Sequence, residues 1–498
     1  MTFRGRTVAL LIGIAIIASS LLTLAWLNIS GSDYTMQKWV DSEPLAKEGQ
    51  GGSKGDKSKE DIPEDLKKVF ETYRAIKENY FTKVEDEELI NGAIEGMVNS
   101  LKDPYSTYMD QKASKHFSES LESTFQGIGA EVTIKDGKVT IVAPFKDSPA
   151  DKAGLKANDQ ILSVNGESIE GLSLYEAVLK IRGPKGSVAN LLIKRSGSAE
   201  PIEVKVVRDE IPIETVFSST VERNGKIFGK IEISQFAFET DQHFIEKLKS
   251  LEEKGIDGLI IDVRGNPGGL LNTVLTISEE LVPNKGVILH VTDRNGEKKT
   301  FNSKLDGKKP YPIVVLVNEE SASASEILAS ALKESGDYPI IGQKTFGKGT
   351  VQSTVEMSDK SSLKLTIAKW LTPKGNWIHE KGVEPTYEVS QPPYFSALQL
   401  PKDKVLKRDM NGPEISNLQI ILQGLGFNVN RSDGYFDENT EKAMRDFQLN
   451  NNLPPTGLLD KDTADLLEEK LRIKLSDPKN DNQLQKAIEV LVNLTEKK

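Results

Sequence analysis

An apolar segment followed by a run of alternating serines occupies the middle of the chain: "YPIVVLVN" (311–318) and "EESASASEILASALKES" (319–335). The first segment is apolar almost throughout, which is typical of a strand buried on both faces of a sheet. The second has the length and the apolar spacing of a helix. Two related units lie nearby, because "GLIIDV" (258–263) precedes "RGNPGG" and a helix-like segment, and "YPIIG" (338–342) follows the serine-rich helix. This alternation predicts a layered α/β core over residues 213–395.

The start of the serine-rich helix is suited to nucleophilic catalysis. Ligands bind beyond the carboxyl ends of strands in such folds, and the first turn of a helix has free backbone N–H groups. Ser323 can therefore attack a carbonyl carbon while the N–H of Ala324 faces the developing oxyanion. A second donor is expected from "RGNPGG", whose glycines allow close backbone approach. We assign it to Gly268, with Gly269 as the neighbouring alternative.

The base that would activate this serine is expected to be a lysine. The chain has no cysteine, and its four histidines have no obvious relation to the serine-rich segment. A buried lysine can act as a base, since burial lowers the pKa of its amine. Lys348, in "FGKGTVQ", follows its own buried strand, and alternation along a strand would place Gln352 on the same face. The sequence predicts a Ser323–Lys348 dyad oriented by Gln352, although "SASAS" alone is commonly a helix N-cap and "GKG" alone a solvated turn.

The N-terminal segment has the features of a membrane anchor. Residues 1–6 carry two arginines, and residues 7–27 form an uncharged apolar run. A helix of this length spans about 30 Å, which is enough to cross a bilayer. The arginines favour a cytoplasmic N-terminus, so that the rest of the chain is extracytoplasmic. A cleaved signal peptide is the alternative.

Composition and spacing indicate a multidomain α/β protein of 498 residues. The formal net charge of −10 argues against nucleic acid as a partner, and we predict no metal site and no cofactor. The units outside the core are a polar tether (28–62), a helical region (63–112), a strand-rich domain (113–212), a linker (396–413), a unit with three helical patterns (414–471) and a charged, weakly helical tail (472–498).

Four segments resemble the carboxyl-terminal processing proteases, also called tail-specific proteases: "DVRGNPGGLL", "NEESASASEIL", "FGKGTVQ" and "TPKGNWIHEKGVEPT". The resemblance runs in order from about residue 63 to 390. It implies a serine endopeptidase with a crotonase-like core, in which Ser323 is the nucleophile, Lys348 the base and Gln352 its support. Where some members have an aspartate after the nucleophile helix, this chain has Glu334, which we leave outside the catalytic set.

The strand-rich domain 113–212 resembles a PDZ domain. Its segment "QGIGAEV" matches the carboxylate-binding loop at Gly127, Ile128 and Gly129. The resemblance implies that these residues hold the C-terminus of a protein substrate, while the peptide adds as a strand beside a helix over 173–182. Arg182 ends that helix. We hypothesise that it couples the PDZ domain to the protease; a structural role at the helix C-terminus is the alternative.

The unit 414–471 resembles a small peptidoglycan-binding module, although a docking or oligomerisation module remains open. Together, these features predict a membrane-anchored, extracytoplasmic serine endopeptidase of a bacterial envelope. It would bind protein C-termini, be gated by its PDZ domain and act in regulated proteolysis. The alternative is a non-catalytic scaffold that holds peptides and the cell wall. A homodimer through the helical region or the tail is also left open.

Overall fold

The computed structural model describes residues 64–496 except 136, 196–197 and 199. The predicted anchor (7–27) and tether (28–62) lie outside the described residues. No helix in the described part is long and apolar enough to cross a membrane.

A six-stranded sheet forms the centre of the core, and its strands run parallel except for the first. In spatial order these strands are β10 (Val216–Arg223), β11 (Lys226–Ile233), β12 (Gly258–Asp262), β15 (Ile313–Val317), β16 (Ile340–Gly342) and β19 (Tyr387–Glu388). Every residue of β12, β15 and β16 is buried, as the apolar runs predict. Parallel pairing brings the carboxyl ends of these three strands to one edge of the sheet.

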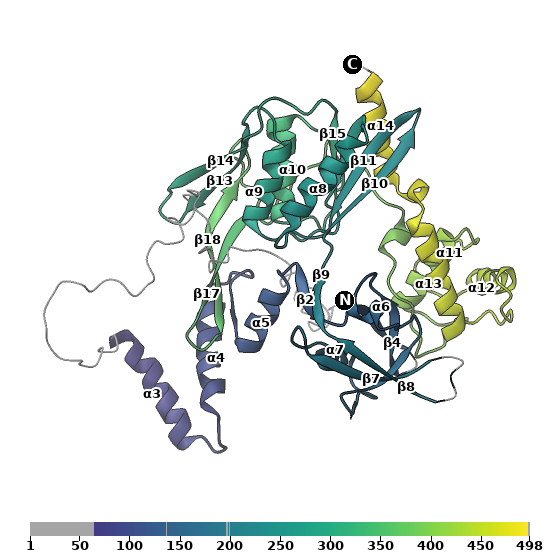
Figure 1. Ribbon diagram of the computed structural model, residues 1–498, viewed down its shortest axis with the longest axis horizontal. Coiled ribbons are helices and arrows are strands. Elements are labelled where there is room, and N and C mark those ends of the chain that lie inside the picture. Colours follow the sequence, from purple (N-terminus) through teal and green to yellow (C-terminus); the bar gives the residue numbers. More distant parts are fainter. Residues whose placement is uncertain (1–63, 136, 196–197, 199, 497–498) are drawn as a thin grey trace, which may run out of the picture.

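Helices cover both faces of this sheet. On one face lie α8 (Thr240–Glu253), α9 (Leu271–Leu281) and α10 (Ala324–Gly336), which pack in one core with the odd-numbered residues of β12 and β15 (Figure 1). The even-numbered Ile260, Val314 and Leu316 point to the opposite face and pack against α14 (Asn482–Glu496). The continuous apolar runs therefore serve two separate cores.

The structure of the tail differs from the prediction of a weakly helical segment. After a short η2 (Pro478–Asn480), α14 forms four turns whose apolar residues recur every three or four positions, at Leu484, Ala487, Ile488 and Leu491. This stripe is what closes the second face of the sheet. Polar and charged residues lie between these positions, so the composition of the tail alone does not reveal its apolar face.

A second, antiparallel sheet lies beside α9 and α10. It contains β1 (Thr107–Met109), β13 (Val287–Asp293), β14 (Lys298–Asn302), β17 (Thr350–Glu356) and β18 (Ser362–Leu371). Its strand β1 comes from the N-terminal region and pairs with β18, so this region is joined to the core by a sheet ladder.

The predicted PDZ domain is a separate β-rich unit with its own core. It comprises β3 (Ala130–Lys135), β4 (Lys138–Pro144), β5 (Gln160–Val164), β6 (Glu167–Ser168), β7 (Val188–Lys194), β8 (Ile202–Val207), α6 (Pro149–Lys152) and α7 (Leu174–Ile181). A two-stranded ribbon of β2 (Thr124–Gly127) and β9 (Asp209–Pro212) connects it to the rest.

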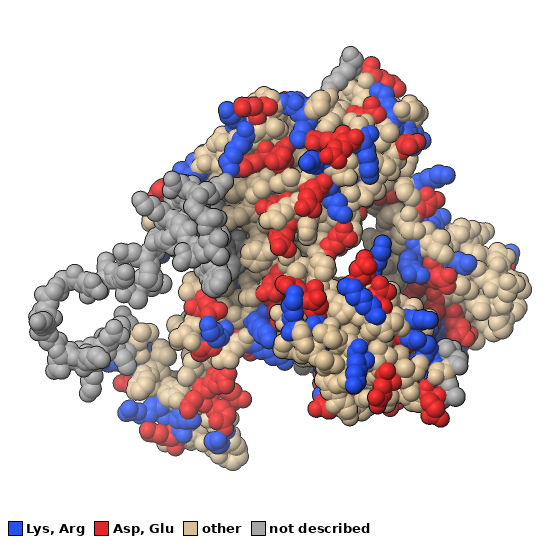
Figure 2. Space-filling model, viewed as in Figure 1, with Lys and Arg blue, Asp and Glu red and all other residues tan. Residues whose placement is uncertain are grey.

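The remaining helices form two peripheral units (Figure 1). In the N-terminal region, α3 (Glu64–Asn79) and α4 (Asp86–Asn99) extend away from the body, and α5 (Gln111–Glu119) lies against it. The C-terminal module contains α11 (Pro413–Gly424), α12 (Glu438–Asn450) and α13 (Lys461–Ser476), preceded by η1 (Pro393–Ser396). Leu400 and Leu406 of the predicted linker are buried in the core of this module. On the face shown in Figure 2, basic and acidic side chains are interspersed.

Candidate active site

Ser323 lies in the turn between β15 and α10, in a strained backbone conformation. Its φ is 52° and its ψ is −109°, a region that residues with a side chain rarely adopt. The side chain is buried, with 6% exposure. The N–H of Ala324 begins the helix, and it donates no hydrogen bond to any described residue. The helix start therefore presents a serine hydroxyl next to a free backbone donor.

The loop "RGNPGG" is held against this turn by Asn266, which is fully buried. The backbone oxygen of Asn266 accepts hydrogen bonds from the N–H of Ala322 (3.0 Å) and from Ser325 Oγ (2.8 Å). The contact is close, since a Cβ on Gly268 would lie 2.9 Å from the Cβ of Ser323. Only glycine fits here, as its φ of 105° also requires.

The two candidate glycines differ in what their N–H groups do. The N–H of Gly268 already donates to Asn266 Oδ1 at 2.8 Å. The N–H of Gly269 donates to none of the described residues. Gly269 also lines a small pocket together with Ser323 and Ala324. In this conformation Gly269, the alternative named above, is the better placed of the two donors.

A buried carboxylate joins the serine turn to the lysine loop. Glu326 Oε2 accepts hydrogen bonds from the N–H of Ser323 and from the N–H of Lys348, both at 2.8 Å. Its Oε1 accepts from Gly347 N–H (2.7 Å) and Thr345 Oγ1 (2.5 Å). Because one oxygen atom binds both backbones, the two predicted catalytic residues are adjacent at their main chains.

Lys348 is buried, with 1% exposure. Its Nζ lies 4.9 Å from the centre of the Tyr105 ring. Burial lowers the pKa of the Lys348 amine well below its ordinary value, and the positive charge of Lys364 lowers it further, whereas Glu326 and Asp103 act in the opposite direction. A lysine whose pKa is lowered in this way is neutral over a wider pH range and can accept a proton.

Gln352 is buried and lines the same small pocket as Ser323. Its Nε2 donates to Thr350 Oγ1 (2.9 Å) and to Thr366 Oγ1 (3.0 Å). Lys348 and Gln352 are not related by strand alternation, because Lys348 precedes β17 and the pairing with β18 shifts between Val351 and Gln352. The amide is placed by a β-bulge instead of by strand alternation.

Several residues around the site were absent from the sequence-based set. Glu326 had a signal, since Ser323 and Glu326 have the S-x-x-E spacing of a capping box. Tyr105 had none, because it lies in the loop before β1. A histidine is also nearer than the sequence suggested: His379 Nδ1 is 3.4 Å from the N–H of Gly349, and its ring is 5.9 Å from that of Tyr105. Glu334, left outside the set, contacts the N–H of Lys374.

The predicted carboxylate-binding loop lies between β2 and β3. Gly129 has a φ of 74°, and a Cβ there would lie 2.5 Å from the Cβ of Ser148, so this position requires glycine. The N–H groups of Ile128 and Gly129 donate to none of the described residues. Two successive free donors of this kind suit a carboxylate.

Arg182 lies beside this loop. Its guanidinium carbon is 4.6 Å from the centre of the Phe125 ring, and its Cγ lies 3.6 Å from a Cβ built on Gly127. The last carbonyl oxygens of α7 receive their hydrogen bonds from another residue. The buried Arg208 donates to the carbonyl oxygens of Ile181 (2.8 Å) and Lys180 (3.1 Å). The purely structural role is thus filled by Arg208.

Four protein-family models match separate parts of the chain. Residues 227–389 match the model of peptidase family S41, and residues 120–194 match that of the PDZ domain. Residues 411–467 match a peptidoglycan-binding domain, and residues 27–113 match the N-terminal domain of the activating protease CtpB.

Whole-length relatives are also found. The chain is 50% identical over 426 residues to the carboxy-terminal processing protease CtpB of Bacillus subtilis, covering 86% of this chain and 89% of that protein. It is 42% identical to the carboxy-terminal processing protease CtpA of the same organism, covering 89% and 94%. Among solved structures, the photosystem II D1 C-terminal processing protease matches with a TM-score of 0.41 and 26% identity, covering 66% of this chain and 94% of that one. The relatives confirm the resemblance noted in the sequence: the chain belongs to the carboxy-terminal processing proteases, serine-type peptidases of family S41.

Proposed function

We propose that this peptidase cleaves peptide bonds through an acyl-enzyme formed by Ser323 and Lys348. The observation that carries this proposal is the single oxygen of Glu326 that binds the N–H groups of both residues. The lowered pKa of the Lys348 amine supports its role as the base. Gln352 would orient the amine without adding a charge, which suits its buried position.

In this mechanism Ser323 Oγ attacks the carbonyl carbon and gives its proton to Lys348 Nζ. The N–H groups of Ala324 and Gly269 bind the oxyanion that forms. The C–N bond then breaks, and the Lys348 ammonium returns the proton to the leaving amine. A water molecule, deprotonated by Lys348, then attacks the ester carbon; the acyl C–O bond breaks, and the Lys348 ammonium returns the proton to Ser323 Oγ. Gly268 acts in shaping this loop, because its own N–H is already donated to Asn266.

Substrates would be recognised by their C-termini at the PDZ domain. The free N–H groups of Ile128 and Gly129 support this proposal, with Gly127 completing the loop. Arg182 would contact a carboxylate bound in this loop, because its side chain lies beside Gly127. Its guanidinium also lies over the ring of Phe125 on β2. Since β2 belongs to the ribbon that joins the PDZ domain to the core, peptide binding would be transmitted along it. The PDZ domain would thereby gate the protease in regulated proteolysis.

The location of the enzyme is proposed from the two ends of the chain. The apolar segment 7–27 would anchor the protein in a bacterial membrane, with the catalytic part extracytoplasmic. The C-terminal module would bind peptidoglycan, as its family match suggests. Two copies would associate through the exposed apolar side chains of α3 and α4.

Digestion of β-casein by the full-length protein tests the proposed chemistry. A peptide with a free C-terminus is added to saturate the PDZ domain. We expect cleavage by the wild type and by Ser330→Ala, whose hydroxyl lies on the same helix and donates to a helix carbonyl. Ser323→Ala and Lys348→Met should lose all measurable cleavage. A fluorophosphonate should label the wild type at Ser323.

The outcomes separate the alternatives. Cleavage by Ser323→Ala at the wild-type rate would remove the nucleophile assignment. Absence of both cleavage and labelling in the wild type, with the peptide bound, would favour the non-catalytic scaffold.

A further inference from the structure

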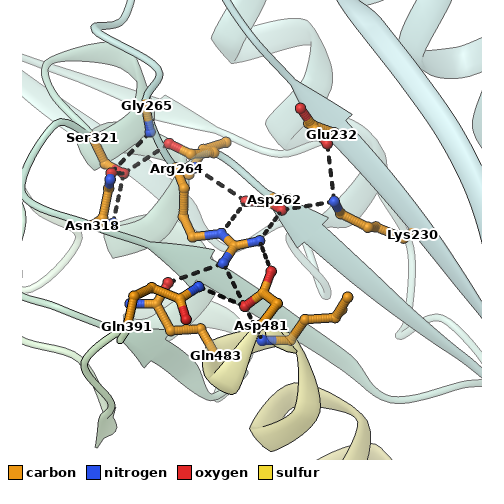
Figure 3. A network of polar contacts seen from close by, with 12 residues as sticks. Lys230, Glu232, Asp262, Arg264, Gly265, Asn318, Ser321, Gln391, Asp481 and Gln483 are labelled. Carbon is orange, nitrogen blue, oxygen red and sulfur yellow. Dashed lines mark hydrogen bonds and ion pairs between the residues drawn. The ribbon is translucent and has the colours of Figure 1, made fainter. Parts of the chain in front are cut away.

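Arg264 forms a buried ionic network between the core sheet and the C-terminal helix (Figure 3). It is the first residue of the "RGNPGG" loop, directly after β12 and Val263. A guanidinium has five N–H donors, and each of them has an acceptor here. Two bonds go to Asp262 (2.8 and 2.7 Å), two to Asp481 (both 2.9 Å) and one to Gln483 (3.0 Å).

Asp481 holds the start of α14 at this place. Besides binding Arg264, its Oδ1 accepts from the N–H of Leu484 (2.9 Å) and so caps the helix. The same oxygen accepts from Gln391 Nε2 at 2.6 Å, and Gln391 Oε1 accepts from the N–H of Asn482 at 3.1 Å. The first turn of α14 is therefore bound to the loop after β12 and to the segment after β19.

The network is largely shielded from water. The side chains of Asp262, Arg264 and Asp481 are 4%, 16% and 13% exposed. Burial alone would raise the pKa of both carboxyls, but Arg264 lowers the pKa of Asp481, and Arg264 with Lys230 lowers that of Asp262 to about 2. Both carboxylates are therefore ionised at neutral pH, and Arg264 lies between two negative charges.

Arg264 fixes one end of the loop that carries Gly269. The middle of the loop is fixed by Asn266, and its far end by backbone bonds from Phe236 N–H to Gly268 O (3.0 Å) and from Leu270 N–H to Phe236 O (2.7 Å). Gly265 N–H donates to Asn318 Oδ1 at 2.9 Å. Loss of Asp481 would leave two guanidinium donors without acceptors and free this end of the loop.

We propose that Asp481 is a positioning residue for catalysis: through Arg264 it holds the loop 264–269 so that the N–H of Gly269 faces the oxyanion. This inference rests on the proposed Ser323–Lys348 mechanism. It makes α14, more than a hundred residues beyond the Lys348 loop, a part of the catalytic unit. Donors that stabilise an oxyanion act only when they are held in place before the reaction, so a small displacement of this loop lowers the rate without changing substrate binding.

The test compares Asp481→Asn with Glu489→Gln in the full-length protein. Both variants remove one carboxylate charge from this region, but Glu489 pairs with Lys486 on the surface of α14. We expect kcat for a β-casein peptide to fall about tenfold or more in Asp481→Asn, with KM within about twofold. Fluorophosphonate labelling should slow in parallel. Glu489→Gln should keep wild-type values.

A double-variant cycle with Arg264→Lys shows whether Asp481 acts through Arg264. The combined variant should lose little beyond Arg264→Lys alone. Rates are divided by the concentration of sites that react with the fluorophosphonate. If Asp481→Asn lowers only that concentration and not the rate per site, the residue is merely structural and the inference is overturned; a wild-type kcat also overturns it. Failure of the proposed function itself is seen separately, as an inactive wild type.

Discussion

Two lysines are buried near the proposed reaction centre, and a positive charge on one disfavours a positive charge on the other. Lys348 is 1% exposed and Lys364, on β18, is 3% exposed. Burial lowers the pKa of Lys364 to about 8, so Lys364 is mainly protonated at neutral pH. Its positive charge disfavours a second charge on Lys348. A buried lysine outside the proposed dyad thus helps to keep the proposed base neutral.

Replacing Lys364 by Met should therefore shift the pH profile. Without the charge of Lys364 the pKa of Lys348 rises, so the acid limb of kcat/KM moves to higher pH. The difference from wild type should vanish above about pH 8, where Lys364 is itself neutral. The measurement is kcat/KM from pH 5 to 10. Lys369→Met, which removes an exposed lysine from the same strand, should leave the limb in place. A limb that moves to lower pH would contradict this account.

At the residue scale, the positions of Ser323 and Lys348 at one edge of the sheet were predictable, but the residues that contact them were not. Ser323 and Lys348 stand in loops that directly follow buried apolar strands, so chemistry and position agree in the sequence. The choice between Gly268 and Gly269 depends on where the amide of Asn266 points, and no local pattern records this. Glu326 acquires its role from acceptor contacts with a loop about twenty residues away, although its capping-box spacing was visible.

Among the elements, the C-terminal end of α7 is contacted by two arginines: Arg182 directly follows the helix, and Arg208 directly precedes β9 of the ribbon β2–β9. Arg208 satisfies the carbonyl oxygens at the helix end, and Arg182 extends over Phe125 of β2. A cation over an aromatic face contributes about 0.5–2 kcal/mol. A bound peptide that moved Arg182 away from Phe125 would therefore remove this stabilising contact with β2.

We expect Arg182→Ala to lose about fivefold or more of the stimulation of cleavage by a C-terminal peptide. Lys180→Ala provides the control, because it removes a cation from the same helix whose partner is Glu167. The rate of β-casein cleavage is measured against peptide concentration. Unchanged stimulation in Arg182→Ala would refute the coupling role and leave the arginine as a packing residue.

The elements themselves were predicted well where periodicity is strong. Continuous apolar runs gave β12, β15 and β16, and their parallel pairing explains why Ser323, the glycine loop and Lys348 share one edge. The strand-like segment beginning at Thr350 was visible in the sequence, but the register of β17 was not. Its bulge arises in the pairing with the next strand, β18, between Val351 and Gln352, and no residue pattern within β17 itself marks that position.

For the whole molecule, the N-terminal region leaves an apolar surface uncovered. Side chains of α3 and α4 such as Phe70 (47% exposed) and Met97 (55%) face solvent, and both helices extend away from the body (Figure 1). Monomeric proteins rarely expose large contiguous apolar patches. The C-terminal tail was the other candidate for a dimer contact, but the apolar face of its helix α14 is already buried against the central sheet of the same chain.

The double variant Phe70→Asp/Met97→Asp should convert a dimer to a monomer. Light scattering is measured on the full-length protein in detergent, and the contribution of the detergent is subtracted. The remaining protein mass of the double variant should be half that of the wild type. Leu449→Asp, at an exposed apolar residue on α12, should remain dimeric. A wild-type protein that has the mass of one chain would remove the proposed association.

At this scale the sequence predicted the order of the units but not how they close on one another. The three-helix module and the PDZ domain have self-contained apolar patterns, so each was recognisable alone. The docking of the tail was missed because the apolar runs predict that Ile260, Val314 and Leu316 are buried but do not indicate which segment covers them.

The position of α14 also bears on how the protein is made. Arg264 and Asp481 are 217 residues apart, so a growing polypeptide emerges with its central sheet covered on one side alone. Until residues 482–496 have been synthesised, Phe228, Ile260 and Leu316 lack the apolar side chains of α14 that pack against them, and such surfaces favour aggregation or chaperone binding. If Asp481 positions the Gly269 loop as proposed, nascent chains halted before α14 should also be inactive.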